Sequence, residues 1–74
     1  MKRFYEVVEV RLNSKNEFNH TLFDTQKVYD SLELAREDYD LRIKDLKARN
    51  IKNISVELNE LDNEGNYISC IEFS

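Results

Sequence analysis

The chain has 74 residues, a formal net charge of −4, one cysteine and one histidine. We expect one domain over residues 1–74, because a chain this short buries only about 60% of its surface and cannot support two cores. The single cysteine excludes an internal disulfide, the single histidine excludes a zinc site built from cysteine and histidine, and the acidic balance disfavours direct nucleic-acid binding.

The first part of the chain predicts a β-hairpin. Residues 4–12 alternate between two faces and are rich in β-branched and aromatic side chains, which is typical of a strand. Residues 13–16 are turn formers, and the alternation returns over residues 18–23. We therefore expect two antiparallel strands joined by a short turn.

The connection from this hairpin to the next element has two interpretations. Residues 24–29 fit either a continuing strand or the first turn of a helix. We favour a bent or bulged strand that ends near Tyr29. Asp30 then serves as the N-cap of the helix, with Glu33 three residues later in the manner of a capping box.

Residues 31–50 predict a helix, because their apolar side chains recur at steps of three and four. The expected core stripe consists of Leu32, Ala35, Tyr39, Ile43 and Leu46. Acidic residues gather near the start of the helix and basic residues near its end, as the helix dipole favours.

A second hairpin follows the helix. Residues 54–61 and 67–73 read as strands, and the chain's only glycine, Gly65, lies in the loop between them. The predicted fold class is therefore α+β with the order ββαββ: a four-stranded, mostly antiparallel sheet with one helix packed across one face.

The second face of this sheet has no predicted cover, and the sequence leaves open which face the helix takes. Both faces carry apolar groups, for example Tyr5 and Val7 on one side of the first strand. An exposed apolar sheet face on a small protein marks an interaction surface.

No catalytic or cofactor site is predicted. Cys70 lies in a predicted strand, where a buried apolar role is expected, and nothing places it beside His20. The acidic loop at residues 62–66 lacks the ligand spacing of a calcium loop, and Glu33 and Glu37 lack matching ligands on a second helix. We expect a protein that is not an enzyme and binds no metal.

The compartment is predicted from what the sequence lacks. Charged residues such as Glu6 and Glu9 interrupt the apolar positions near the N-terminus, so we expect no signal peptide. No apolar stretch approaches the length of a membrane span. Together with a free thiol, these features predict a cytoplasmic protein with no membrane contact.

The leading functional hypothesis is a non-enzymatic domain that binds another protein. Compact acidic proteins without catalytic groups are often phage or mobile-element inhibitors of host nucleic-acid defence enzymes, of the anti-restriction or anti-CRISPR type. Residues 53–74 contain five acids and no base, so an acidic hairpin would occupy a basic groove of such an enzyme. The expected contact residues are Tyr5, Glu57, Glu60, Asp62, Glu64, Tyr67 and Glu72.

Two alternatives belong to other classes. The first is a structural homo-oligomer, such as a homodimer, in which the uncovered sheet face pairs with its symmetry mate. The second is a nucleic-acid contact protein that uses the basic end of the helix. Its contact residues would be Arg42, Lys44, Lys47, Arg49 and Lys52.

Overall fold

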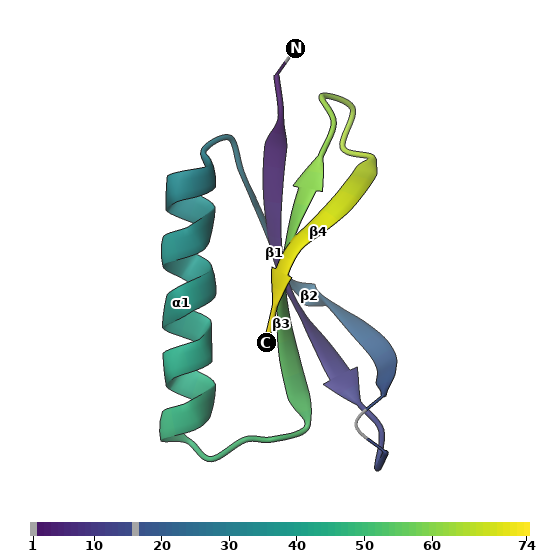
Figure 1. Ribbon diagram of the computed structural model, residues 1–74, viewed down its shortest axis with the longest axis vertical. Coiled ribbons are helices and arrows are strands. Elements are labelled where there is room, and N and C mark those ends of the chain that lie inside the picture. Colours follow the sequence, from purple (N-terminus) through teal and green to yellow (C-terminus); the bar gives the residue numbers. More distant parts are fainter. Residues whose placement is uncertain (1, 16) are drawn as a thin grey trace.

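The computed structural model describes residues 2–15 and 17–74 and has the predicted order ββαββ (Figure 1). The elements are β1 (Phe4–Leu12), β2 (Phe18–Tyr29), α1 (Leu32–Ala48), β3 (Ile54–Leu61) and β4 (Tyr67–Phe73). The strands form one antiparallel sheet in the order β2-β1-β3-β4, and α1 packs against one face of it. The predicted fold class is confirmed.

The turn between β1 and β2 is organised by the Asn13 side chain. Its Oδ1 accepts hydrogen bonds from the backbone N–H groups of Lys15, at 2.9 Å, and Glu17, at 3.0 Å. An asparagine that satisfies the backbone in this way stabilises a tight turn. Of the predicted turn residues, Asn16 lies outside the described residues.

The predicted irregularity of β2 is confirmed, and β2 ends at Tyr29. Val7 pairs with Lys27 but Glu9 pairs with Leu22, so four residues of β2 stand opposite one residue of β1. The Thr25 hydroxyl holds this bulge together, because it accepts from Glu9 N at 2.9 Å and donates to Leu22 O at 2.6 Å. A bulge bends and twists its strand. Figure 1 shows the far end of the β1–β2 hairpin swinging away from α1.

The N-cap prediction was wrong by one residue. Ser31, not Asp30, caps α1: its backbone is extended and its Oγ accepts from Leu34 N at 3.4 Å. Asp30 instead lies 3.8 Å from Lys2 Nζ in an exposed ion pair. Serine and aspartate are both good caps, so the choice depended on where the chain leaves β2.

The core lies between α1 and one face of the sheet, which we call the helix face. Its buried members are Val7, Ala35, Tyr39, Leu46, Val56 and Leu58. Leu32 was expected in this stripe but is 38% exposed, because the helix meets the sheet only from Ala35 onward. Burial of these side chains is the main stabilising contribution to the fold.

The opposite face of the sheet, the non-helix face, is partly buried without a helix. Val8, Val10 and Leu61 are buried there. Phe18 of β2 and Phe73 of β4 come from opposite edges of the sheet, yet their rings meet edge to face with centroids 5.8 Å apart. The sheet therefore curls, and its own edge strands shield the middle of this face.

β4 is an irregular edge strand. Its pairing with β3 shifts twice, so Ile68 and Ile71 are left without a partner in the register. All seven residues of β4 are exposed. The strand thus presents its side chains to solvent while its backbone departs from a regular ladder.

A polar network joins the helix to β1 and β2. Asp38 accepts hydrogen bonds from the Tyr29 hydroxyl at 2.8 Å and from Arg42 Nε at 2.9 Å, and Arg42 also reaches Glu9 at 3.3 Å. Burial alone would raise the pKa of Asp38. The hydrogen bonds from Arg42 and Tyr29 and the charge of Arg42 outweigh it and hold this pKa below its usual range.

This network predicts a pH-dependent contribution to stability. Asp38→Asn should lower the free energy of unfolding at pH 7 by about 1 to 2 kcal/mol, the scale of a hydrogen bond to a charged group. Since the folded-state pKa is depressed, the contribution is present above the ordinary carboxyl pKa of about 3.9 and disappears as the pH falls through the folded value. Urea unfolding at pH 7 and pH 2 measures it.

The matched control for this experiment is Asp45→Asn. Asp45 of α1 pairs with the C-cap residue Arg49 at 3.1 Å, again four residues apart, but both side chains are about 60% exposed. Exposed pairs of this kind contribute little. Equal effects of the two substitutions, or an effect of Asp38→Asn that persists at pH 2, would contradict the assignment.

Candidate interaction surface

The register of the sheet places two glutamates on the non-helix face. Glu6 of β1 stands opposite Asn59 of β3, and Val8 stands opposite Glu57. β4 then adds Cys70 opposite Asn59. Residues directly opposite in neighbouring antiparallel strands point to the same side of the sheet. This part of the non-helix face is therefore polar, beside apolar neighbours such as Val8 and Phe73.

Asn59 holds these two glutamates together. Its side chain is only 2% exposed, and its Nδ2 donates to Glu6 Oε1 at 2.8 Å and to Glu57 Oε1 at 3.3 Å. Gln26 of β2 also donates to Glu6. The Asn59 Oδ1 is buried and has no hydrogen-bond partner. Buried polar atoms are nearly always paired, so this acceptor is an exception that needs an explanation.

The glutamates of the helix face are arranged differently, because each has an arginine. The pairs are Glu9 with Arg42 at 3.3 Å, Glu60 with Arg3 at 4.0 Å and Glu72 with Arg36 at 2.8 Å. None of the ion pairs among residues 2–15 and 17–74 includes Glu6 or Glu57. The two basic residues within the strands, Arg11 and Lys27, pair with Ile54 and Val7 and so stand at helix-face positions. Glu6 and Glu57 on the non-helix face thus have no ion-pair partner among the described residues.

Aromatic side chains flank this charge. Phe73 stands opposite Glu57, Tyr67 stands opposite Leu61 on the same face, and Phe18 packs on Phe73. The three residues are 56% to 62% exposed. Aromatic residues of this kind dominate the energetics of protein interfaces.

Cys70 is exposed, not buried as the strand position suggested. The expectation failed because β4 is an uncovered edge. Partial burial, and then the charge of Glu57, raise the pKa of the Cys70 thiol. The effect of Glu57 on this thiol agrees with their placement on the same face.

The structure divides the predicted acidic contact surface. Tyr5 is partly buried against the helix-face core, and Glu60 and Glu72 lie on the helix face beside their arginines. Only Glu57 and Tyr67, of the predicted contact residues, lie on the non-helix face. The predicted hairpin residues therefore form no continuous acidic surface.

The remaining two acids, Asp62 and Glu64, belong to the β3–β4 loop. Asp62 Oδ1 accepts from the backbone N–H groups of Asn66, at 2.8 Å, and Glu64, at 2.9 Å. These hydrogen bonds hold the pKa of Asp62 below its usual range. Asp62 therefore organises the loop, and Glu64 is exposed at its tip.

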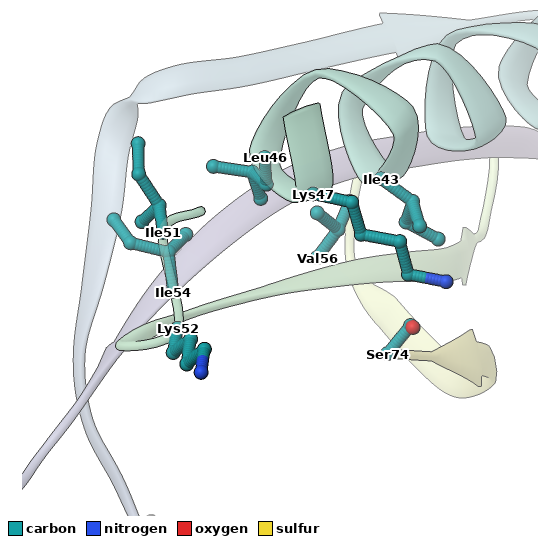
Figure 2. Close-up of a pocket in the computed structure, with 8 residues that line it drawn as sticks. All are labelled: Ile43, Leu46, Lys47, Ile51, Lys52, Ile54, Val56 and Ser74. Carbon is teal, nitrogen blue, oxygen red and sulfur yellow. The ribbon is translucent and has the colours of Figure 1, made fainter. Parts of the chain in front are cut away.

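The basic residues of the alternative nucleic-acid site do not form one surface either. Arg42 is engaged by Asp38 and Glu9, and Arg49 by Asp45, while Lys44 is exposed on α1. Lys47 and Lys52 line a small cavity under the end of the helix, as Figure 2 shows. Its volume is about 130 Å³. Its other lining residues are Ile43, Leu46, Ile51, Ile54, Val56 and Ser74. Ligand pockets have volumes of about 300 Å³ or more, so this cavity is too small for one.

Among the residues of the non-helix face that were not predicted as contacts, only Glu6 had a signal in the sequence. Glu6 interrupts the apolar phase of residues 4–12, and a charged residue in such a phase indicates a special position. Asn59, Phe18 and Phe73 gave no comparable signal, because their importance depends on pairing between distant strands.

No three His, Cys, Asp or Glu side chains among residues 2–15 and 17–74 are grouped in a way that could hold a metal ion. In the same part of the chain, no helix has the length and apolar character needed to cross a bilayer. Comparison with protein-family models, curated proteins and solved structures gave no significant match.

Proposed function

We propose that this chain is a non-enzymatic protein-binding domain whose partner docks on the non-helix face. The observation that carries the proposal is the group of exposed aromatic residues, Phe18, Tyr67 and Phe73, around a β4 strand with no buried residue. Apolar patches of this kind on soluble proteins mark interaction sites.

The exposed surface area of the chain is large enough to contribute part of a protein interface. The chain exposes 5148 Å², whereas the scaling for a compact monomer of this mass gives about 4,800 Å². Three aromatic side chains, each more than half exposed, offer on the order of 300 Å². A stable interface needs about 800 Å² on each side, so the partner would also contact the strands around the patch.

We also propose a cellular compartment for the protein and a kind of partner. The free thiol of Cys70 supports a reducing compartment, and we place the protein in the cytoplasm. Inhibition of a host nucleic-acid defence enzyme, with this chain as a phage or mobile-element protein, stays a prediction. Its acidic-hairpin form loses support, because Glu60 and Glu72 each have an arginine partner.

The two other functional classes receive less support. Stacking two copies through the non-helix face would bury Glu6 and Glu57 of both copies in one interface without ion-pair partners from the described residues, and like charges at an interface are unfavourable. Nucleic-acid binding by the helix end would have to release Arg42 from Asp38 and Glu9.

The proposal is tested by affinity capture with Phe73→Ser. In cells that produce the protein, tagged wild type should retain a partner that is recovered at least tenfold less with Phe73→Ser, since loss of an interface aromatic commonly costs more than a factor of ten in affinity. Leu41→Ser is the control, because Leu41 is 65% exposed on the helix. Equal recovery with all three proteins would refute docking on this face.

A further inference from the structure

We propose that the non-helix face recognises a basic side chain of the partner protein, an arginine or lysine flanked by apolar residues, which docks at Glu6 and Glu57. The inference rests on the proposed protein-binding function and adds the chemistry of the partner. It follows from the charge, the geometry and the apolar border of this part of the surface.

Within the part of the chain that the structure describes, Glu6 and Glu57 lack the cationic partners that the helix-face glutamates have. Each glutamate at a helix-face position has an arginine within 4.0 Å, whereas Glu6 and Glu57 have only amide donors among the described residues. Both glutamates are half-buried, which weakens their solvation and strengthens their attraction for a cation. A cationic group of a partner would neutralise Glu6 and Glu57 as the arginines neutralise the helix-face glutamates.

The geometry is already arranged for such a group. One Asn59 nitrogen binds an oxygen of each glutamate, so these two oxygens lie within about 6 Å of each other. A guanidinium carries five N–H donors in a rigid fork and binds carboxylates through more than one of them. The Oδ1 of the same Asn59 side chain is buried and has no hydrogen-bond partner.

Apolar residues border Glu6 and Glu57, and they suit the aliphatic part of a basic side chain. Val28 stands opposite Glu6 and Phe73 opposite Glu57, and both are exposed. Long basic side chains bury their aliphatic stems along apolar surface, and guanidinium groups also stack on aromatic rings. A basic residue with apolar neighbours would therefore contact the carboxylates and the border together.

Other occupants fit these observations less well. A metal ion lacks ligands, since no group of three His, Cys, Asp or Glu is suitably arranged among residues 2–15 and 17–74. A second copy related by a two-fold axis through this group would oppose Glu6 and Glu57 with the same two residues, and a phosphate would be repelled by them. A basic protein segment is the occupant whose charge and shape both match.

The test is selection of random twelve-residue peptides displayed on phage against the full chain. We expect the enriched peptides to share an arginine or lysine between apolar residues. Synthetic copies should bind the Glu6→Gln/Glu57→Gln double variant at least tenfold more weakly than the wild type. Asp40→Asn/Glu64→Gln is the control, because it makes the same charge change at exposed positions on α1 and in the β3–β4 loop.

A second measurement does not depend on the folding of any variant. Replacing the peptide's arginine by citrulline, or its lysine by norleucine, should also weaken binding to the wild-type protein at least tenfold. Enriched peptides without a basic residue, or equal affinity for wild type and Glu6→Gln/Glu57→Gln, would overturn the inference.

The outcomes separate this inference from the proposed function. Apolar peptides that bind through Phe73 but are indifferent to Glu6 and Glu57 would leave protein binding standing and remove the basic partner. Failure to enrich any peptide that depends on Phe73 would count against both.

Discussion

Leu58→Ala should lower the free energy of unfolding by about 3 kcal/mol, within the range of about 2 to 5 kcal/mol for deleting a buried leucine side chain. Leu58 is fully buried in the core beside Val7 and Val56. A domain of this size has little stability in reserve, so this loss would remove much of it. We expect the melting temperature to fall by about 12 to 24 °C, measured by circular dichroism.

The control is Leu41→Ala on the outer side of α1. The same atoms are removed there from a side chain that is 65% exposed. The change in unfolding free energy should stay within about 0.5 kcal/mol. Similar losses at positions 41 and 58 would mean that the helix packs on the sheet through another face than the one described.

Asn59→Asp should destabilise the protein by about 3 kcal/mol or more at pH 7.5, the cost of a buried charge without a partner. The Asn59 side chain is almost fully buried, and its Nδ2 is the donor shared by Glu6 and Glu57. Aspartate would remove that donor and add a third negative charge. Burial and the like charges would raise the pKa of the new carboxyl in the folded state.

The loss of stability caused by Asn59→Asp should depend on pH. A carboxyl with a raised folded-state pKa binds more protons folded than unfolded, so stability falls as the pH rises and returns as the pH is lowered through that pKa. Urea unfolding at pH 4.5 and pH 7.5 should therefore show a larger defect at pH 7.5. Asn63→Asp makes the same change in the exposed β3–β4 loop and should have little effect at either pH. A defect independent of pH would argue against a buried acidic group.

The element order could be predicted because its signals are local. Alternation in residues 4–12 and 54–61, helical spacing in residues 31–50 and the glycine at position 65 each indicate one element without knowledge of the others. Even the irregular end of β2 followed from the continued strand pattern up to Tyr29. The exact helix start did not, since Asp30 and Ser31 are both capable caps and only the path of the chain selects one.

The candidate surface could not be predicted in the same way. Both faces of β1 carry apolar residues, and the helix selects one by packing its Ala35, Tyr39 and Leu46 against the core residues of the sheet. Tyr5 was expected at an interface and lies against the core for this reason. The acidic group depends on the register that sets Glu6 opposite Asn59, 53 residues away. Pairings at such distances leave no local trace in the sequence.

The irregular pairing of β4 affects how this protein behaves at high concentration. A flat apolar edge strand is a template on which identical chains can stack into fibrils. The two shifts that leave Ile68 and Ile71 unpaired break the even spacing of backbone donors and acceptors that such stacking requires. β4 can therefore keep its apolar side chains available to a partner while its backbone resists aggregation.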